Sequence, residues 1–358
     1  MDKNKTEITY LDRNEHQYGP APACFEVLKN ISPETLSEYS RDFTLGIKSP
    51  LSQRLATEYN IDEKSVLLGF GGEDLLKQTI HCYIQKGDSI MLPTYSWWYY
   101  KKIVDEVEGI KMEYPVREGE DTFYYDIEGM FEMYDAHRPK LVLISSPNNP
   151  TGNRLEIPEL LRVLEKMKDT LVIVDEAYSL FFNQDHSHLK DIIDRFPNII
   201  VIRTFSKYYG LAGVRIGFAL IGKNLEKLAT FSARLLGYNR LSEAIALAAL
   251  DSSEYYQGIN TKMAGDIDLF RNEFNKLPGF TAYKTYANFI LVKIPMEIKD
   301  PLKKYLTDRN MIVKFMAEDG LFNHIRITIG TQVQNRLLLQ LIHSFLFEHK
   351  QNELDCRI

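Results

Sequence analysis

The sequence has few cysteines and no long hydrophobic run. Its 3 cysteines, Cys24, Cys82 and Cys356, are odd in number and lack the spacing of metal ligands, so we expect reduced thiols in a cytoplasmic protein and no metal site. No apolar run approaches the roughly 18 residues that a membrane-spanning helix needs. The opening residues, MDKNKTEITY, are polar and predict no secretion signal.

The chain also lacks an excess of positive charge. It carries 43 Lys and Arg against 49 Asp and Glu, a formal net charge of -6, so we expect neither nucleic acid nor an anionic membrane as a partner. With 358 residues, the chain exceeds the roughly 250 to 300 residues that one hydrophobic core usually serves. This length predicts one large domain and a smaller one.

Strands and helices alternate from Ser65 onward. Apolar strands that alternate with helices predict an α/β fold whose parallel sheet is covered on both faces. Right-handed crossovers then bring the carboxyl ends of the strands to one edge, where ligands bind in such sheets. The predicted strands span residues 66–68, 89–92, 111–116, 141–145, 171–174 and 199–202, and the predicted helices between them span 73–84, 95–106, 127–134 and 158–167.

The pattern changes after Gly222. Two long helices are predicted, over 224–250 and 252–276. Beyond them we expect a small α+β unit that includes the N-terminal arm, with strands at 289–294, 312–315 and 325–329 and helices at 302–309 and 333–348. We therefore expect a large cofactor-binding domain over 40–240, and a small domain made of 1–39 and 241–358.

Polar residues follow three of the predicted strands. The strand at 141–145 leads to Asn149, the strand at 171–174 to Asp175 and Tyr178, and the strand at 199–202 to Ser206 and Lys207. A lysine amine in an apolar pocket loses part of its charge and can attack a carbonyl carbon. A buried aspartate needs a cationic partner, and since no side chain is obviously placed for that purpose, a ligand cation is a candidate.

A glycine-rich turn supplies a second chemical feature. Gly71 to Asp74 open a predicted helix, whose first NH groups form an anion site. Ser206 and Arg215 can complete a phosphate cup. Pyridoxal phosphate needs all of these parts: an amine for its aldehyde, a carboxylate for its ring nitrogen, donors for its phenolate oxygen and a cup for its phosphate. The residues therefore predict pyridoxal phosphate as the cofactor.

Several motifs in the same order resemble a known family. SPNNPTG at 146–152, VDEAY at 174–178 and SK at 206–207 resemble the fold type I pyridoxal-phosphate-dependent aminotransferases. The histidinol-phosphate aminotransferases are the more similar group, through NEHQYGP, GFGGED, PTYSWW, ANFILV and IRITIG. The resemblance implies an aminotransferase with a mostly parallel seven-stranded sheet flanked by helices, and a smaller α+β domain.

The resemblance also implies a role for each matching residue at the cofactor. Lys207 would bond covalently to the cofactor and move protons, and Asp175 would pair with its pyridine nitrogen. Asn149 and Tyr178 would hold the phenolate oxygen, and Trp98 would stack on the ring. The cofactor phosphate would be bound by the backbone NH groups of Gly72 and Glu73 and by the side chains of Ser206 and Arg215.

The remaining implied contacts concern a second subunit and the substrates. Tyr39 would reach the phosphate in the neighbouring subunit, which implies a homodimer. Arg326 would bind the carboxylate of the amino donor, for which glutamate is expected. The other substrate contacts that we predict are Lys314, Tyr18 and His16.

Two departures from the family pattern bear on the substrate. Lys314 stands where the family has an arginine, and an ammonium cannot form a two-pronged contact with phosphate. His16 and Gln17 replace the usual Asn-Pro. Histidinol phosphate or another phosphorylated amino alcohol or keto compound would suit such a site. A decarboxylase of a phosphorylated amino acid, similar to threonine-phosphate decarboxylase, is the alternative. A non-catalytic sensor fused to a DNA-binding domain is disfavoured by the negative charge.

Overall fold

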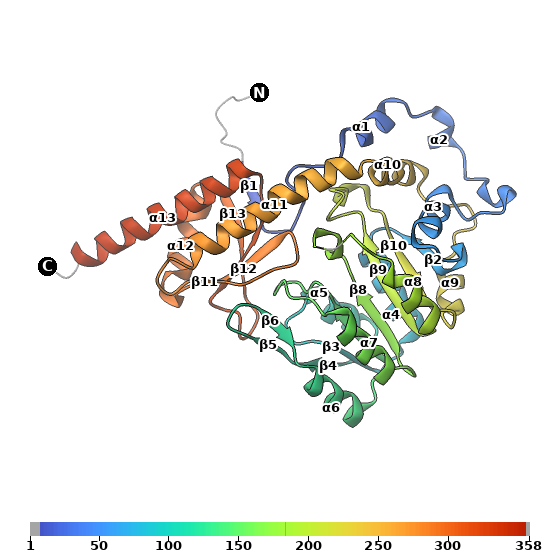
Figure 1. Cartoon of the computed structure of the whole chain (residues 1–358), viewed down its shortest axis with the longest axis horizontal. Helices are drawn as coiled ribbons and strands as arrows, with labels where there is room; N and C mark the ends of the chain where they lie inside the picture. Colours follow the sequence, from blue (N-terminus) through green and yellow to red (C-terminus); the bar gives the residue numbers. More distant parts are fainter. Residues whose placement is uncertain (1–7, 183, 356–358) are drawn as a thin grey trace.

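The computed structural model describes residues 8–182 and 184–355, so Cys356 lies outside the described residues. Two sheets form the centres of two lobes that lie along the long axis of the molecule (Figure 1). None of the described helices combines the length and the apolar character that crossing a membrane requires. The strands of the larger sheet are β2 (Val66–Gly69), β3 (Ser89–Pro93), β4 (Ile110–Tyr114), β7 (Leu141–Ser145), β8 (Leu171–Asp175), β9 (Ile199–Thr204) and β10 (Gly217–Ile221).

The larger sheet has seven strands in the order β2-β10-β9-β8-β7-β3-β4. All neighbouring pairs from β9 to β4 are parallel, whereas β10 runs antiparallel to both β9 and β2. The connection from β9 to β10 contains no α-helix, and a parallel neighbour would need a longer crossover. The prediction of a mostly parallel seven-stranded sheet is confirmed, and β10 is its antiparallel member.

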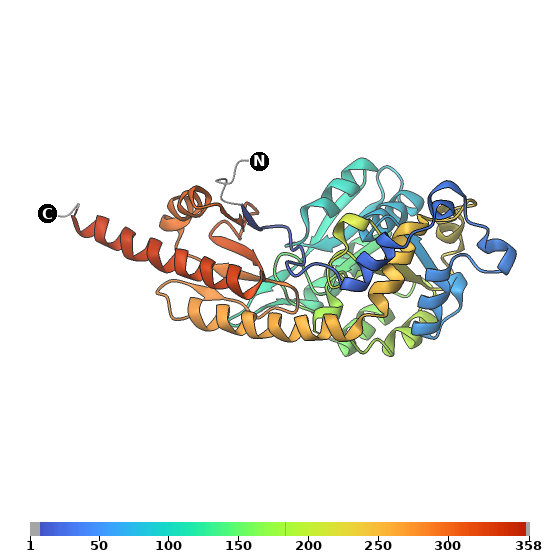
Figure 2. The same cartoon turned by 90° about the horizontal axis from the view of Figure 1, so that it is seen from above.

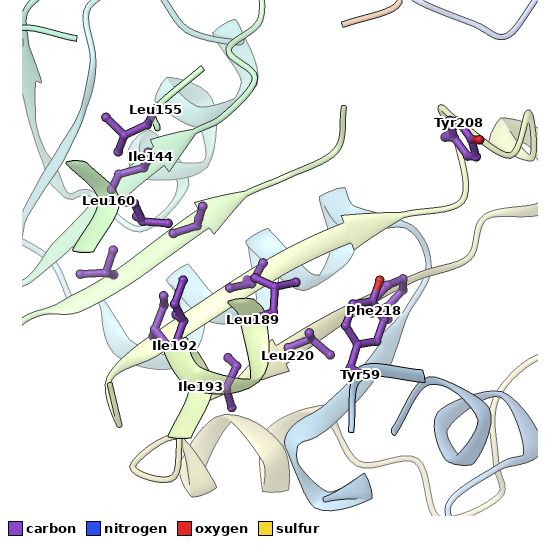
Figure 3. Packing of buried hydrophobic residues seen from close by; sticks show 14 of the residues in the cluster. Tyr59, Ile144, Leu155, Leu160, Leu189, Ile192, Ile193, Tyr208, Phe218 and Leu220 are labelled. Carbon is purple, nitrogen blue, oxygen red and sulfur yellow. The ribbon is translucent and has the colours of Figure 1, made fainter. Parts of the chain in front are cut away.

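Helices cover both faces of this sheet, and Figure 3 shows some of the buried side chains that pack together on one of them. Successive strand residues alternate between faces: Val172 and Val174 join one hydrophobic cluster, whereas Ile173 joins the other. The first cluster includes buried residues of α6 (Ile127–His137), α7 (Ile157–Lys166) and α8 (His188–Arg195), and the second includes those of α4 (Gly72–Tyr83), α5 (Trp98–Glu106) and α9 (Glu226–Ser232).

The prediction of one helix over 224–250 is wrong. The structure has two helices there, α9 and α10 (Arg240–Leu250), separated by an irregular segment. Within that segment Gly237 has a φ of 84°, which glycine adopts without strain. Asn239 then caps α10, because its side chain accepts a hydrogen bond from the backbone NH of Ser242. The following helix, α11 (Ser253–Phe274), is a single long element that reaches from one lobe to the other (Figures 1 and 2).

The smaller sheet has five strands in the order β1-β13-β14-β12-β11. Its first strand comes from the N-terminal arm and pairs parallel with β13, so that Thr9 lies opposite Met311. The helices α1 (Pro22–Lys29) and α2 (Pro33–Ser37) instead contact α10 beside the larger lobe. The predicted domain boundaries at residues 40 and 240 stay a prediction. The elements of the smaller lobe are β1 (Thr9–Leu11), β11 (Thr281–Ala282), β12 (Phe289–Lys293), β13 (Met311–Phe315), β14 (His324–Thr328), α12 (Lys299–Asp308) and α13 (Gln332–Asp355).

Candidate active site

A cavity of about 750 Å³ lies between the two lobes. Its walls are the carboxyl ends of β8 and β9, the amino ends of α4 and α5, the N-terminal arm at residues 12–15, and the strands β13 and β14. The larger sheet thus presents the carboxyl ends of its central strands to the cavity, as expected for a ligand site in an α/β sheet.

Lys207 follows β9 and reaches into this cavity. Its Nζ donates hydrogen bonds to two backbone carbonyl oxygens of the N-terminal arm, at 3.1 Å to Arg13 and 3.3 Å to Asn14. Nζ also lies 5.6 Å from the centre of the Tyr178 ring. No ion pair joins Lys207 to an acidic side chain in the described part of the chain. Two carbonyl oxygens of the arm therefore hold the amine, and one of its three N–H donors remains for the cavity.

Asp175 ends β8 and faces the same cavity. Its Oδ2 accepts a hydrogen bond of 2.7 Å from the Tyr100 hydroxyl, and its Oδ1 accepts one of 3.0 Å from the backbone NH of Ala177. Burial raises the pKa of Asp175, and the bond from Tyr100 opposes that shift. Among the described residues no lysine or arginine forms an ion pair with this carboxylate, which leaves its charge available to a cationic ligand.

The amino end of α4 forms an anion-binding cup. Gly71 precedes the helix with a φ of 87°, and a Cβ on it would come within 2.8 Å of the Arg215 guanidinium, so only glycine fits. Arg215 Nη1 lies 3.5 Å from Ser206 Oγ, and Nη2 donates to the carbonyl oxygen of Phe70 at 3.2 Å. Bared NH groups, a guanidinium and a hydroxyl therefore converge as a phosphate requires.

Arg326 forms the opposite wall, on β14. It is 8% exposed, and burial lowers its pKa. Its guanidinium donates to Asn149 Oδ1 and, at 2.5 Å, to the carbonyl oxygen of Asp12, while Nε is buried and has no hydrogen-bond partner among the described residues. No ion pair to Arg326 is found within the described ranges. Lys314 lies opposite it in the β13–β14 register and also lines the cavity, so two cations adjoin at this wall.

Comparison with known proteins decides the family. The family model for aminotransferases of class I and II matches residues 7–342 of the chain. The chain belongs to this family. Its relatives include the histidinol-phosphate aminotransferase of Caldanaerobacter subterraneus subsp. tengcongensis, which is 31% identical over 337 residues that make up 94% of this chain and 92% of the relative. The predictions of the family, of the enzyme class and of pyridoxal phosphate as cofactor are confirmed.

Solved structures confirm the fold. The histidinol-phosphate aminotransferase of Sinorhizobium meliloti, in complex with pyridoxal-5'-phosphate, superposes with a TM-score of 0.83 at 23% identity and covers 94% of this chain and 92% of its own. The L-threonine-O-3-phosphate decarboxylase of Porphyromonas gingivalis has a TM-score of 0.78, also at 23% identity, and covers 94% of this chain and 98% of its own. At these identities the likeness establishes a shared fold.

The residues of this aminotransferase fit its cofactor on structural grounds. Asp175 is a carboxylate without an ion-pair partner among the described residues, a Cβ at Gly71 would meet the Arg215 guanidinium of the α4 cup, and Lys207 is an amine that lines the same cavity. Trp98 lines the cavity and is 57% exposed, so its ring is free to cover a ligand. The roles of Asn149, Tyr178, Gly72, Glu73 and Ser206 stay predictions, and all five line the cavity.

Three predicted residues lie outside the cavity of the single chain. His16 is buried, with its ring 6.3 Å from Tyr18 and 6.4 Å from Tyr256, and burial lowers its pKa to about 4. The Tyr18 hydroxyl accepts a hydrogen bond from the backbone NH of Gln332 instead. Tyr39 is 70% exposed and does not line the cavity, as its implied role in a neighbouring subunit requires. The substrate contacts of His16 and Tyr18 stay predictions.

Sequence reasoning missed Asn14 as a site residue of the aminotransferase. Asn14 is 1% exposed and has a φ of 56°. Its Nδ2 donates to the Tyr178 hydroxyl at 3.0 Å, its backbone NH donates to Thr328 Oγ1 at 2.9 Å, and its carbonyl oxygen accepts from Asn288 Nδ2 at 3.0 Å as well as from Lys207. The only available signal was its place at the start of the motif NEHQYGP.

Proposed function

We propose that the protein transfers an amino group between two pairs of compounds: glutamate with 2-oxoglutarate, and a phosphorylated amino alcohol of the histidinol phosphate type with its keto compound. The observation that carries this proposal is the wall formed by Arg326 and Lys314, which places a buried unpaired guanidinium beside a second cation in the cavity. An unpaired buried charge is costly, so an anionic substrate group would stabilise it. The relative from Caldanaerobacter, which bears the name of a histidinol-phosphate aminotransferase, supports the same substrate class.

The side chains of the cavity divide the chemistry among them. Bound pyridoxal phosphate supplies an electron sink when a bond at the substrate's α-carbon breaks. Asp175 keeps a proton on the pyridine nitrogen, which the electron sink needs. Lys207 takes the proton from the α-carbon of the amino donor, and it gives a proton to the α-carbon of the second substrate when the reaction runs in the opposite direction. Arg326 would bind the substrate carboxylate, and its guanidinium contacts Asn149, which would hold the phenolate oxygen of the cofactor.

The test of the substrate is a half-reaction screen of the holoenzyme, in which glutamate and histidinol phosphate are each mixed with the enzyme and the loss of the lysine-bound cofactor's absorbance is followed. Both compounds should remove the absorbance of the lysine-bound cofactor, and the dephosphorylated amino alcohol should remove it far more slowly. Release of carbon dioxide from a phosphorylated amino acid, without a need for 2-oxoglutarate, would instead identify a decarboxylase.

Lys314→Met should slow the reaction with histidinol phosphate by about tenfold to a hundredfold, because a charge-assisted hydrogen bond contributes about 1.5 to 3 kcal/mol. The glutamate half-reaction serves as the internal control and should change little. Lys303→Met, which removes an exposed lysine of α12, should leave both half-reactions unchanged. Equal losses for both substrates would contradict a phosphate contact by Lys314.

We further propose that the enzyme is a homodimer. Exposed apolar side chains gather on two neighbouring segments, residues 36–45 and 231–236, which we call the apolar surface. Arg240, just after the second segment, donates hydrogen bonds to the carbonyl oxygens of Glu34 and Glu38 beside the first. Large exposed apolar side chains on neighbouring segments favour an interface, and Tyr39 is one of them. The members are Leu36, Tyr39, Phe43, Leu45, Phe231, Leu235 and Leu236.

Leu235→Asp should convert the dimer to a monomer, because Leu235 is 90% exposed in the single chain and an interface would bury it. Molar mass from light scattering after gel filtration measures the change. Val333→Asp is the matched control, since Val333 of α13 is 77% exposed but lies away from the apolar surface. A wild-type monomer, or a Leu235→Asp dimer, would refute the proposed interface.

We also propose a cytoplasmic location. Cys24 and Cys82 are buried free thiols, which persist in a reducing compartment. Their burial supports the prediction of reduced thiols for these two residues.

A further inference from the structure

Tyr100 connects the apolar core of the larger lobe to the active site. It belongs to α5, is 2% exposed, and packs in the hydrophobic cluster that includes Ile103, Val104 and Leu143. Its ring enters this core from the helix side, while its hydroxyl reaches the cavity and lies 2.7 Å from Asp175 Oδ2. A phenylalanine would fill the same volume, so the hydroxyl has a purpose other than packing.

The hydroxyl acts as a donor to the carboxylate. Burial raises the pKa of Tyr100 well above its ordinary value, so the phenol keeps its proton. A phenol that keeps its proton and lies at 2.7 Å from a carboxylate oxygen donates to it. The oxygen of Tyr100 also lies 3.3 Å from Ser145 Oγ on β7, but the shorter contact to the carboxylate is the stronger one for its single proton.

Asp175 needs such a donor because its surroundings oppose its charge. Desolvation favours the protonated carboxyl, and the adjacent Glu176 carboxylate acts in the same sense. Two donors contact this carboxylate in the described chain. The NH of Ala177 comes from the same turn as Asp175, whereas the hydroxyl of Tyr100 comes from another element, α5. The titratable groups that act on Asp175 are Tyr125 of β6 (Phe123–Tyr125), Glu176 after β8, Lys207 after β9 and Tyr100 of α5, and Tyr178 acts on Tyr100.

We propose that Tyr100 is a positioning residue of the reaction: its hydroxyl keeps the Asp175 carboxylate charged and aimed at the pyridine nitrogen of the cofactor. The inference rests on the proposed role of Asp175 as the partner of that nitrogen. It adds a residue that acts through the carboxylate of Asp175. One Oδ2 lone pair is taken by Tyr100 and one Oδ1 lone pair by Ala177, so the remaining lone pairs face the cavity.

The test compares Tyr100→Phe with Tyr114→Phe. Tyr114 is a matched control because it is 0% exposed and its hydroxyl donates to the backbone oxygen of Leu143 at 3.0 Å, so each variant loses a buried, hydrogen-bonded hydroxyl. The first readout uses the apoenzyme: carboxyl ¹³C NMR follows the titration of Asp175, whose signal is identified by its absence in Asp175→Asn. The second is the affinity of the apoenzyme for pyridoxal phosphate across pH, from the quenching of tryptophan fluorescence.

Tyr100→Phe should move the Asp175 titration and the acidic limit of cofactor binding to higher pH, and should lower kcat about tenfold with little change in KM, as when a partner that orients a functional group is removed. Tyr114→Phe should leave the titration, the binding limit and kcat at their wild-type values. If both variants behave alike, Tyr100 is only a packing residue and the proposal is overturned.

A wild-type measurement keeps the inference testable if Tyr100→Phe does not fold. The hydroxyl proton of a buried tyrosine bonded to a carboxylate should give a resolved NMR signal in the apoenzyme that shifts as Asp175 titrates and moves in Asp175→Asn. A Tyr100 hydroxyl signal that changes neither with the titration of Asp175 nor in Asp175→Asn would refute the contact. Failure of the proposed role of Asp175 is separate, because Asp175→Asn would then turn over normally whatever Tyr100 does.

Discussion

Lys207→Ala is expected to abolish the visible absorbance of the holoenzyme and to reduce turnover by at least about a thousandfold. Proton transfer by a positioned side chain alone contributes roughly 10²- to 10⁴-fold, and this variant also removes the amine that bonds to the cofactor. The absorbance spectrum after reconstitution and the rate of glutamate consumption measure the two losses. The α4 cup and Asp175 remain in the variant, so the cofactor should still bind without a covalent bond.

The control for this variant is Lys227→Ala. Lys227 lies on α9 and bonds to the carbonyl oxygen of Cys82, away from the cavity, so its removal should preserve both colour and turnover. Persistence of the absorbance and of turnover in Lys207→Ala would contradict the role of Lys207 as the lysine that bonds to the cofactor.

Asp175→Asn is expected to lower kcat by about a hundredfold or more while part of the cofactor affinity is retained. An amide has nearly the shape of the carboxylate but carries no charge, so it cannot hold a proton on the pyridine nitrogen. That proton is what allows the ring to accept electrons, and the loss falls within the range of acid–base contributions to catalysis. Single-turnover rates with glutamate measure the effect without interference from product release.

Asp169→Asn is a suitable companion to this variant. Asp169 is exposed and precedes the same strand, β8, so it controls for the change of charge without touching the cavity. A rate for Asp175→Asn close to that of Asp169→Asn would remove Asp175 from the mechanism.

The convergence of Lys207 and Asp175 was predictable because of sheet geometry. Parallel strands end at one edge, so residues that follow consecutive strands become neighbours even when many residues separate them in the chain. The register pairs Asp175 with Ile202, five residues before Lys207, and both side chains line the cavity.

The contacts of Asn14 and Tyr100 were not predictable by the same reasoning. Asn14 meets Thr328 from the other end of the chain, and no periodic pattern encodes a pairing at such a separation. Tyr100 follows Trp97, Trp98 and Tyr99, and a run of aromatic residues predicts a position in the hydrophobic core. Its ring is indeed in the core, and only the position of Asp175 reveals the purpose of its hydroxyl.

The helix α8 was missed although the sequence carries a signal for it. Leu189, Ile192, Ile193 and Phe196 have the spacing of one helical face, and all four are buried. The gap between α9 and α10 is different. The apolar residues Phe231, Leu235 and Leu236 continue the helical pattern across it, but they are exposed in the single chain, so the pattern there does not report burial in the chain's own core.

The parallel pairing of β1 with β13 has a consequence for how the chain is made. Thr9 pairs with Met311, and Asn14 bonds to Thr328 at a sequence separation of 314 residues. At roughly 5 to 20 residues per second, a ribosome needs tens of seconds to synthesise that interval. The strands of the larger sheet, from Val66 to Ile221, all emerge earlier. The arm that holds Lys207 must therefore wait for its partner strands, and the catalytic cavity is completed only near the end of translation.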